Sequence, residues 1–173
     1  MKILALNGSL RARSSNAAIL RSALAATDAT SAVADIAALP HFHPDLDTEG
    51  ATPPAPVAAL RRAAAEADAV LVVSPEYAHG VPGVLKNALD WLVSSAEFLD
   101  KPAAVLTASP SPTGAEYAHE QLRETLRMMS ARVIPDACRN FGSIAPKTDP
   151  ATGTVTDPAT LQELRTAMAA LRS

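Results

Sequence analysis

Residues 3–16 read ILALNGSLRARSSN, and this stretch places a strand, a polar loop and the start of a helix in succession. The apolar run from Ile3 to Leu6 is of strand length and is too continuous for a half-exposed strand, which is typical of parallel strands buried on both faces. The loop from Asn7 to Asn16 carries hydroxyls, amides and two arginines. Because a helix N-terminus leaves backbone N–H groups unpaired, this loop predicts an anion-binding site.

The side chains of this loop suit a phosphate group. Gly8 permits a tight turn with close backbone approach, and Arg11 can pair with phosphate oxygens, while Ser14 or Asn16 can add neutral hydrogen bonds. The loop lacks the Gly-Lys-Ser/Thr ending of nucleoside triphosphate sites and the GxGxxG spacing of dinucleotide-binding folds. A plainer interpretation stays open, in which Ser14, Ser15 and Asn16 only cap the helix and the arginines are solvated.

Further apolar runs of strand length lie at 70–73 and 103–106, and weaker strand patterns lie at 32–36 and 132–138. Pro135 favours an edge position or an early end for the last strand, because proline cannot donate a ladder hydrogen bond. The segments between strands show one apolar face at helical spacing. These faces comprise Ile19, Leu20, Ala23 and Leu24; Val57, Leu60, Ala64 and Ala67; Val81, Val84, Leu85, Ala88, Leu89 and Leu92; Leu122, Leu126 and Met129; and Leu161, Leu164, Met168 and Leu171. The alternation predicts an α/β fold, a doubly wound, five-stranded parallel sheet with helices on both faces.

The composition describes one globular domain over residues 1–173, with 48% hydrophobic and 19% charged residues. A net charge of −3 and an aromatic content of 3% argue against a nucleic-acid partner, which would need a basic surface and stacking rings. No apolar run approaches the about 18 residues of a membrane span.

The single cysteine, Cys138, fits a reducing compartment, and we expect it to be a buried apolar residue rather than a nucleophile. The expected location is cytoplasmic.

A second unusual loop, SPEYAHGVPG at 74–83, follows the third predicted strand. Ligands of doubly wound sheets bind beyond the C-terminal ends of the strands, so the loops after the first, third and fourth strands should meet at one site. Prolines and glycines make this loop a rigid platform, whose backbone groups can bond the edge of a flat heterocycle while Tyr77 packs alongside. These features favour an isoalloxazine, the ring system of flavins.

GSLRARSSN at 8–16 and PEYAHGVPGVLKNALDWL at 75–92 closely resemble the signature of the NADPH-dependent FMN reductase family, which includes quinone, chromate and azo-dye reductases. The segment 38–46 also resembles the stretch that follows the second strand in this family. The resemblance implies a flavodoxin-like sheet of order 2-1-3-4-5. It also implies bound FMN, held at the phosphate by Ser9, Arg11, Ser14 and Asn16 with Ser15 beside them, at the ring and ribityl chain by Pro75, Glu76, Tyr77 and Ala78, and by Ser109 after the fourth strand.

Two positions depart from the family pattern. Ala78 stands where many relatives carry asparagine, so any side-chain hydrogen bond there is lost and we expect weaker binding of FMN. The loop 109–114 is rich in proline where relatives often carry glycines near the flavin.

The resemblance implies an enzyme, an NAD(P)H-dependent FMN oxidoreductase of the quinone reductase type. The expected mechanism is ping-pong: NADPH or NADH gives a hydride to FMN and leaves, and a flavin, a quinone or a similar small molecule then takes the electrons. No catalytic side chain is required. Relatives are commonly homodimers or homotetramers, and the helix at 84–93 could supply an interface. Trp91 on this helix is either part of that interface or a core residue.

Two other classes stay open. One is a flavodoxin-like electron carrier for a protein partner, although the acidic character and the Thr- and Gly-rich loop of such carriers are not evident. The other is a flavodoxin-like binding module that no longer holds flavin, with Ala78 and the 109–114 loop as signs of decay.

Four polar residues after the second strand, His41, His43, Asp45 and Asp47, alternate as metal ligands could. Polar residues in a proline-containing loop are commonly solvent-exposed, so we expect no metal site. His79 in the second loop could donate a proton to a reduced quinone, and the alternative is a solvent-facing histidine.

Overall fold

The computed structural model describes residues 1–11 and 13–172. Within these residues the main sheet has the strand order β2-β1-β3-β4-β5, and neighbouring strands are parallel. The register pairs Leu4 with Val70 and Val72 with Val105. The predicted α/β class and the order 2-1-3-4-5 are confirmed. The strands are β1 (Lys2–Asn7), β2 (Thr30–Val33), β3 (Ala69–Ser74), β4 (Pro102–Ala108) and β5 (Arg132–Val133).

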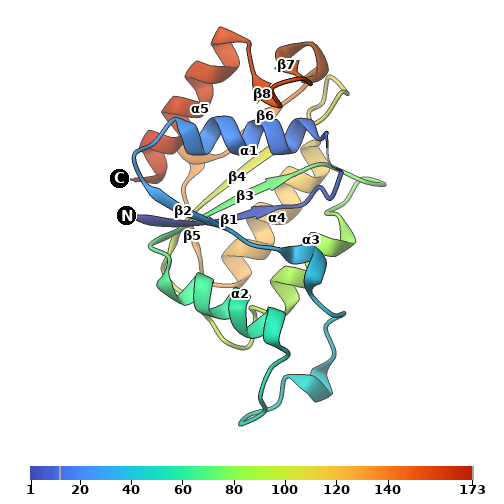
Figure 1. Ribbon diagram of the computed structural model, residues 1–173, viewed down its shortest axis with the longest axis vertical. Helices are drawn as coiled ribbons and strands as arrows, with labels where there is room; N and C mark the ends of the chain where they lie inside the picture. The colour runs from blue at the N-terminus through green and yellow to red at the C-terminus, as the bar shows by residue number, and fades with distance from the viewer. Residues whose placement is uncertain (12, 173) are drawn as a thin grey trace.

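Helices cover both faces of the sheet (Figure 1). On one face lie α1 (Ser15–Ala25) and α5 (Pro158–Leu171), and on the other lie α2 (Ala55–Glu66), α3 (Gly83–Asp90) and α4 (Glu116–Met128). Two of these helices begin at side-chain caps, because Ser14 accepts from the N–H of Asn16 and Asp157 accepts from the N–H of Thr160.

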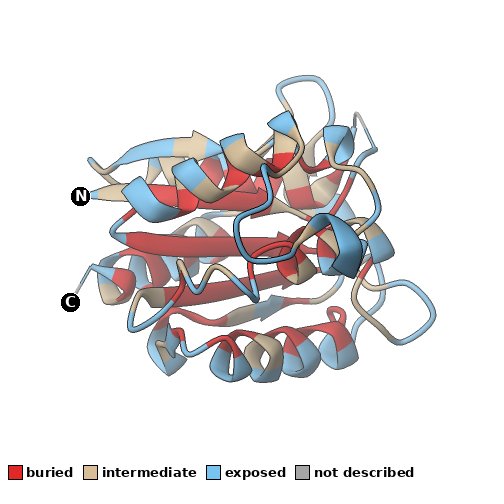
Figure 2. Cartoon of the chain, turned by 90° about the horizontal axis from the view of Figure 1, so that it is seen from below, coloured by how far each residue is buried: buried red, intermediate tan, exposed pale blue. Residues whose placement is uncertain are grey.

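The core lies in two layers, one on each side of the sheet, and Figure 2 shows that the central strands between these layers are buried. Alternate residues of β3 serve different layers: Val70 and Val72 pack toward α2, α3 and α4, and Leu71 and Val73 pack toward α1 and α5. All six residues of β3 are buried. This burial explains the continuous apolar run in the sequence, since a strand covered on both faces has no polar side.

The strand predicted at 132–138 is shorter than this range, and it ends before Pro135, which is the early end that the proline favoured. β5 ends at Val133, a 3-10 turn, η3 (Pro135–Ala137), follows, and β6 (Arg139–Phe141) then pairs with the other end of β4. Pro135 has no N–H for the ladder, and its fixed φ suits the first position of the turn. Within the described residues the sheet therefore has six strands, because β5 and β6 both pair with β4.

The second strand also differs from its predicted range of 32–36. β2 covers Thr30–Val33, and Ile36 begins a 3-10 turn, η1 (Ile36–Ala38), in which the N–H of Ala37 donates to the carboxylate of Asp35. A further 3-10 turn, η2 (Pro44–Leu46), precedes α2.

An antiparallel hairpin between β6 and α5 was not predicted. It consists of β7 (Thr148–Asp149) and β8 (Thr154–Val155), preceded by the 3-10 turn η4 (Ala145–Lys147). The hairpin docks on α1, because the N–H of Val155 donates to Ser22 Oγ at 3.0 Å.

Trp91 lies in the core, which decides between the two roles considered for it. Its side chain is fully buried, its Nε1 donates to the backbone oxygen of Pro40 at 2.9 Å, and its ring meets that of Phe42 edge to face with centroids 5.1 Å apart.

No helix in residues 1–11 and 13–172 is long and apolar enough to cross a membrane.

Candidate functional site

Three loops and the first turn of α1 enclose a cavity of about 230 Å³, which we call the edge cavity. The first loop (8–14) follows β1, the second (75–82) follows β3 and the third (109–115) follows β4, so the cavity lies beyond the C-terminal ends of the strands. Nine of the ten residues predicted to bind the cofactor line it. The lining consists of Ser9, Arg11, Ser14, Ser15, Asn16, Pro75, Glu76, Tyr77, Ala108, Ser109 and Pro110.

Gly8 lets the first loop pass close to the end of β3. Its N–H donates to the oxygen of Val73 at 2.8 Å, and a Cβ at this position would lie 2.8 Å from Ser74 Oγ and 3.0 Å from Leu85 Cδ2. A side chain would therefore push the loop away from the sheet. The close approach brings the N–H of Ser9 to Asn7 Oδ1 at 3.1 Å and leaves Ser9 buried beside the cavity.

Asn16 places an unpaired acceptor at the edge cavity. Its Nδ2 donates to the oxygen of Ala108 at 3.1 Å, which ties α1 to the end of β4 and fixes the orientation of the amide. The Oδ1 of Asn16 is buried and has no hydrogen-bond partner among the described residues. A buried acceptor without a partner costs free energy, so this atom is available to a donor that comes close to Asn16.

Arg11 contributes a positive charge to the cavity. It is exposed, and its Nε donates to the backbone oxygen of Arg13 at 3.0 Å. No carboxylate among residues 1–11 and 13–172 forms an ion pair with it. Ser14 does cap α1, as the plainer interpretation held. The guanidinium and the N-terminal turn of α1 nevertheless converge on one cavity, where they can neutralise an anion.

The second loop turns back on itself in a tight two-residue turn. The N–H of Tyr77 donates to the oxygen of Gly80 at 3.1 Å, and the N–H of Gly80 donates to the oxygen of Tyr77 at 3.0 Å. The two central residues have positive φ values, 50° for Ala78 and 57° for His79. Ala78, in this turn, is the one predicted contact that does not line the cavity.

Glu76 fastens the second loop to α4. Its Oε2 accepts from the N–H of Ala118 at 3.0 Å. The helix needs this partner, because Ala115 stands at its N-cap position without a capping side chain. Gln121 adds a second link, since its Nε2 donates to the oxygen of His79 and its Oε1 accepts from the N–H of Val81.

Exposed rings surround the second loop. Tyr77 is 59% exposed and Tyr117 is 53% exposed. The ring of His79 stacks on that of Tyr117, with centroids 4.3 Å apart and planes 15° apart. His79 is therefore an exposed histidine, in line with the solvent-facing alternative. Of these rings, Tyr77 lines the edge cavity and His79 and Tyr117 do not.

The third loop is held in place by β6. The N–H of Ser109 donates to the oxygen of Phe141, and the oxygen of Ser109 accepts from the N–H of Ile144, both at 3.1 Å. Ser109 Oγ accepts from the N–H of Ser111 at 3.0 Å. Ala108 and Pro110 also line the cavity and were missed by the sequence analysis. Their position directly beside Ser109, at the end of a predicted strand, is the signal that could have found them.

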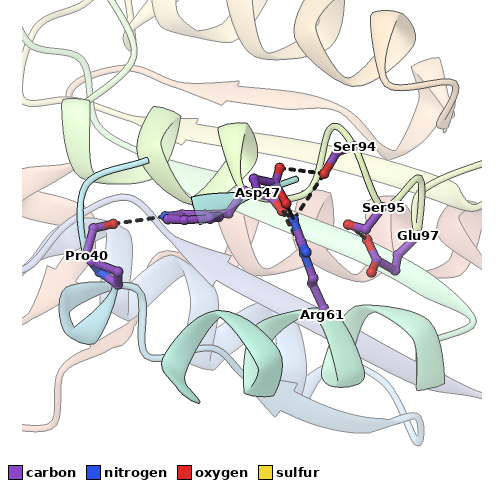
Figure 3. A network of polar contacts seen from close by, with 7 residues as sticks. Pro40, Asp47, Arg61, Ser94, Ser95 and Glu97 are labelled. Carbon is purple, nitrogen blue, oxygen red and sulfur yellow. Dashed lines mark hydrogen bonds and ion pairs between the residues drawn. The ribbon is translucent and has the colours of Figure 1, made fainter. Parts of the chain in front are cut away.

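One of the four alternating polar residues, Asp47, makes contacts of another kind. No group of His, Cys, Asp and Glu within the described ranges could hold a metal ion. Asp47 instead pairs with Arg61 Nη2 at 2.7 Å and accepts from Ser94 Oγ at 2.6 Å, as Figure 3 shows. Burial opposes ionisation of Asp47, but the hydrogen bonds from Ser94 and Arg61 outweigh it and lower its pKa.

Cys138 is buried in the core, as predicted. Burial raises the pKa of its thiol, although the N–H of Val105 donates to its Sγ at 3.4 Å. A buried thiol with a raised pKa is unreactive.

A doubly wound parallel sheet with a loop-lined anion cradle at its C-terminal edge defines a flavodoxin-like α/β protein. The model of the NADPH-dependent FMN reductase family matches residues 1–146. The chain therefore belongs to the NADPH-dependent FMN reductase family. The predicted family, the oxidoreductase class and the pairing of FMN with NAD(P)H are thereby confirmed.

Known relatives agree with this assignment. The quinone reductase of Escherichia coli strain K12 is 35% identical over 169 residues, which cover 95% of this chain and 89% of the relative. An NAD(P)H-dependent FMN reductase of Pseudomonas aeruginosa is 40% identical over 130 residues, covering 73% of this chain and 69% of the relative. Among solved structures, the flavoenzyme NAD(P)H:(acceptor) oxidoreductase FerB of Paracoccus denitrificans superposes with a TM-score of 0.83 at 28% identity, covering 98% of this chain and 94% of that one.

Proposed function

We propose that FMN binds in the edge cavity and that the chain passes electrons from NAD(P)H through it to a quinone or a similar small acceptor. The observation that carries the proposal is the convergence of nine predicted contacts, from three separate loops and α1, on one cavity. Residues 66 positions apart in the sequence, Ser9 and Pro75, belong to the same lining.

The donors and acceptors of the cavity fit the phosphate and ribityl end of FMN. Arg11 and the first turn of α1 offer positive charge to the phosphate. Asn16 Oδ1 offers a buried acceptor, which suits a ribityl hydroxyl better than an ionised phosphate oxygen, because phosphate oxygens are themselves acceptors. We therefore assign Arg11, Ser14 and Ser15 to the phosphate and Asn16 to the adjoining chain.

The isoalloxazine would lie at the mouth of the cavity. Ligand sites that enclose a whole drug-sized molecule usually measure about 300 to 1,000 Å³. The edge cavity, at about 230 Å³, is too small to enclose all of FMN. The ring would then rest on Pro75, Glu76 and Tyr77, where NAD(P)H and an acceptor can reach it.

When bound, FMN supplies the hydride-accepting chemistry. The protein's part is to position the ring. Glu76 fixes the second loop to α4 through the N–H of Ala118, and the two hydrogen bonds between Tyr77 and Gly80 hold the turn of this loop. Relatives named quinone reductases support a quinone as acceptor. Donor and acceptor would use the same open mouth in turn, which supports the ping-pong order.

Oligomeric state, domain organisation and location complete the proposal. We propose one flavodoxin-like domain over 1–173 that forms a homodimer or a homotetramer in the cytoplasm. α3 buries Leu85, Ala88 and Leu89 in its own core, so the exposed rings Tyr77 and Tyr117 offer more apolar surface to a second copy than α3 does. Light scattering of the purified protein gives the oligomeric state directly.

The experiment that tests the function is an absorbance spectrum of the protein after loading with FMN and desalting, followed by anaerobic NADPH and then a quinone. We expect retained yellow flavin that bleaches with NADPH and recovers with quinone. Parallel double-reciprocal plots at several quinone concentrations would support the ping-pong order. A colourless protein that neither keeps FMN nor oxidises NADPH would overturn the proposal in favour of a flavin-free module.

A further inference from the structure

A second and larger cavity, which we call the side cavity, adjoins the edge cavity and measures about 790 Å³. Its walls are the N-terminal half of α1 on one side and the segment 145–153, which includes the β7 hairpin turn, on the other. It shares Arg11, Ser14 and Ser15 with the edge cavity. The two cavities therefore meet at the proposed phosphate end of FMN and not at the ring end.

The side cavity is positively charged in a chain whose net charge is −3. Arg11, Arg13 and Arg21 all line it, and none of them forms an ion pair with a carboxylate of the described residues. Asp149 is the acidic residue of the lining. Its carboxylate is already engaged in its own turn, because it accepts from the N–H of Ala151 at 2.8 Å and from Thr152 Oγ1 at 3.0 Å. Three guanidinium groups facing one occupied carboxylate favour an anionic ligand.

The outer wall of the side cavity is fixed to α1. Arg21 Nε donates to the oxygen of Gly153 at 2.8 Å, and Ser22 Oγ accepts from Val155 N–H at 3.0 Å. Gly153 has a φ of +66°, and a Cβ there would collide with the guanidinium of Arg21. The positive φ favours glycine in this turn, and a side chain here would displace the Arg21 guanidinium from its contact. The cavity is a formed feature and not a gap between unconnected segments.

The remaining lining consists of small residues, both polar and apolar. Ser14, Ser15, Thr148 and Thr152 are the polar ones, and Ala18 on α1 and Ala145, Pro150 and Ala151 on the opposite segment are the apolar ones. Such walls can contact both faces of a flat aromatic base, and the volume lies within the about 300 to 1,000 Å³ of small-molecule sites. A lone phosphate would fill only a small part of this space. The combination of partly apolar walls, volume and three arginines suits a phosphorylated nucleoside.

We propose that the side cavity binds the phosphorylated adenosine half of a dinucleotide whose other half either lies in the edge cavity or reaches the flavin ring at the mouth of that cavity. This inference rests on the proposed binding of FMN, because the shared residues place the new site beside the flavin phosphate. Two dinucleotides carry this chemistry. In NADPH, the half that would bind in the side cavity is the adenosine that bears the 2′-phosphate. In FAD, the half that would bind there is the adenylate joined directly to the flavin phosphate.

Arg13 is the residue whose side chain tests the site. It is exposed and lines the side cavity but not the edge cavity, so its truncation spares the proposed contacts to FMN. Arg62 on α2 is an exposed arginine that lines neither cavity, so Arg62→Ala is the matched control.

The experiment is calorimetric titration of the FMN-treated full chain with adenosine 2′,5′-bisphosphate, a probe that holds neither flavin nor nicotinamide. We expect binding that Arg13→Ala weakens about tenfold, the factor that corresponds to one charge-assisted contact. Binding should weaken further with added salt and stay unchanged in Arg62→Ala. Absence of binding, or equal binding in Arg13→Ala and the parent protein, overturns the inference. Because the readout is heat and not turnover, this result is independent of whether the chain reduces quinones.

Two further arms identify the source of the adenosine. If the probe competes with NADPH for the FMN-loaded protein, the site serves the electron donor, and Arg13→Ala should lower kcat/KM for NADPH more than for NADH. If FAD binds the apoprotein at least tenfold more tightly than FMN does and then blocks the probe, the site serves the flavin. Either pattern supports the side cavity as an adenosine site.

Discussion

Single residues in the second loop carry conformational strain that a substitution can relieve. Ala78 has a φ of 50°, a conformation that costs a residue with a Cβ about 1 to 2 kcal/mol and that asparagine tolerates better. Ala78→Asn should therefore stabilise the fold by about 1 kcal/mol, which raises the melting temperature by about 2 to 4 °C in a chain of this size. Tyr77 begins this turn and lines the edge cavity, so a turn that is populated more fully in the free protein should also let FMN bind more tightly. Thermal melts and flavin titration measure the two effects.

Ala96 provides the control for Ala78. It is exposed, also has a positive φ, 55°, and does not line the edge cavity. Ala96→Asn should raise the melting temperature in the same way and leave the affinity for FMN unchanged. A lower melting temperature for Ala78→Asn would contradict the strain argument.

His119 should make stability depend on pH. It is buried in α4, and its Nδ1 lies 3.1 Å from Thr107 Oγ1; burial, aided by the charge of Arg123, lowers its pKa. At a pH between the pKa of His119 in the folded protein and its pKa in the unfolded chain, the imidazole is protonated in the unfolded chain and neutral in the folded protein. The stability contributed by neutral His119 is thus complete above the unfolded value of about 6.5 and is lost as pH falls toward the folded value, by up to about 1.4 kcal/mol per pH unit.

Urea unfolding between pH 5 and pH 7.5 measures this dependence. His119→Gln should flatten the slope below pH 6.5, while His41→Gln, at an exposed histidine, should not. Equal slopes for His119→Gln and the parent protein would exclude His119 as the cause.

At the scale of elements, Arg61 connects α2 to two other segments. Its guanidinium bonds Asp47 at 2.7 Å and the backbone oxygen of Trp91 at 2.7 Å (Figure 3 shows the pair with Asp47). Only 8% of the Asp47 side chain is exposed. Removing one partner of a largely buried ion pair costs up to about 3 to 5 kcal/mol, because the other charge stays without compensation. Arg61→Met should therefore lower the free energy of unfolding by several kcal/mol in chemical denaturation.

The double variant Arg61→Met/Asp47→Asn separates charge from packing. It should recover part of the loss, since no buried charge remains. Arg62→Met, one residue along α2 at an exposed position, should be nearly neutral. If the double variant is as unstable as Arg61→Met alone, the uncompensated charge is not the reason for the loss.

The elements that the sequence predicted correctly are those with a local signal. The buried strands β1, β3 and β4 appear as unbroken apolar runs, and the helices show one apolar face each. The hairpin of β7 and β8 has strands of two residues, too short for any periodicity, and depends on contacts to Ser22 and Arg21 over 130 residues away in the sequence. Tertiary contacts of this kind leave no pattern in a local window.

At the scale of the whole molecule, most of the lining of the edge cavity was predictable because the fold brings the ends of parallel strands to one edge. The sequence motifs named nine lining residues, while Ala108 and Pro110 have no chemical signature of their own. The unpaired Oδ1 of Asn16 and the arginines of the side cavity could not be predicted, because both depend on which groups face each other across segments more than 90 residues apart.

Because the edge cavity joins loops from β1, β3 and β4, a ligand bound there should stabilise the whole fold. A ligand that binds only the folded state at a concentration 100 times its Kd adds about 2.7 kcal/mol. At about 2 to 4 °C per kcal/mol for a chain of this length, FMN should raise the melting temperature by about 5 to 11 °C. Riboflavin has the same ring and chain but no phosphate, so it should give a smaller shift at equal concentration. In Arg11→Ala the shifts from FMN and riboflavin should converge, because the difference between them comes from the charge on the phosphate. Equal shifts from the two flavins in the parent protein would show that the first loop does not bind the phosphate.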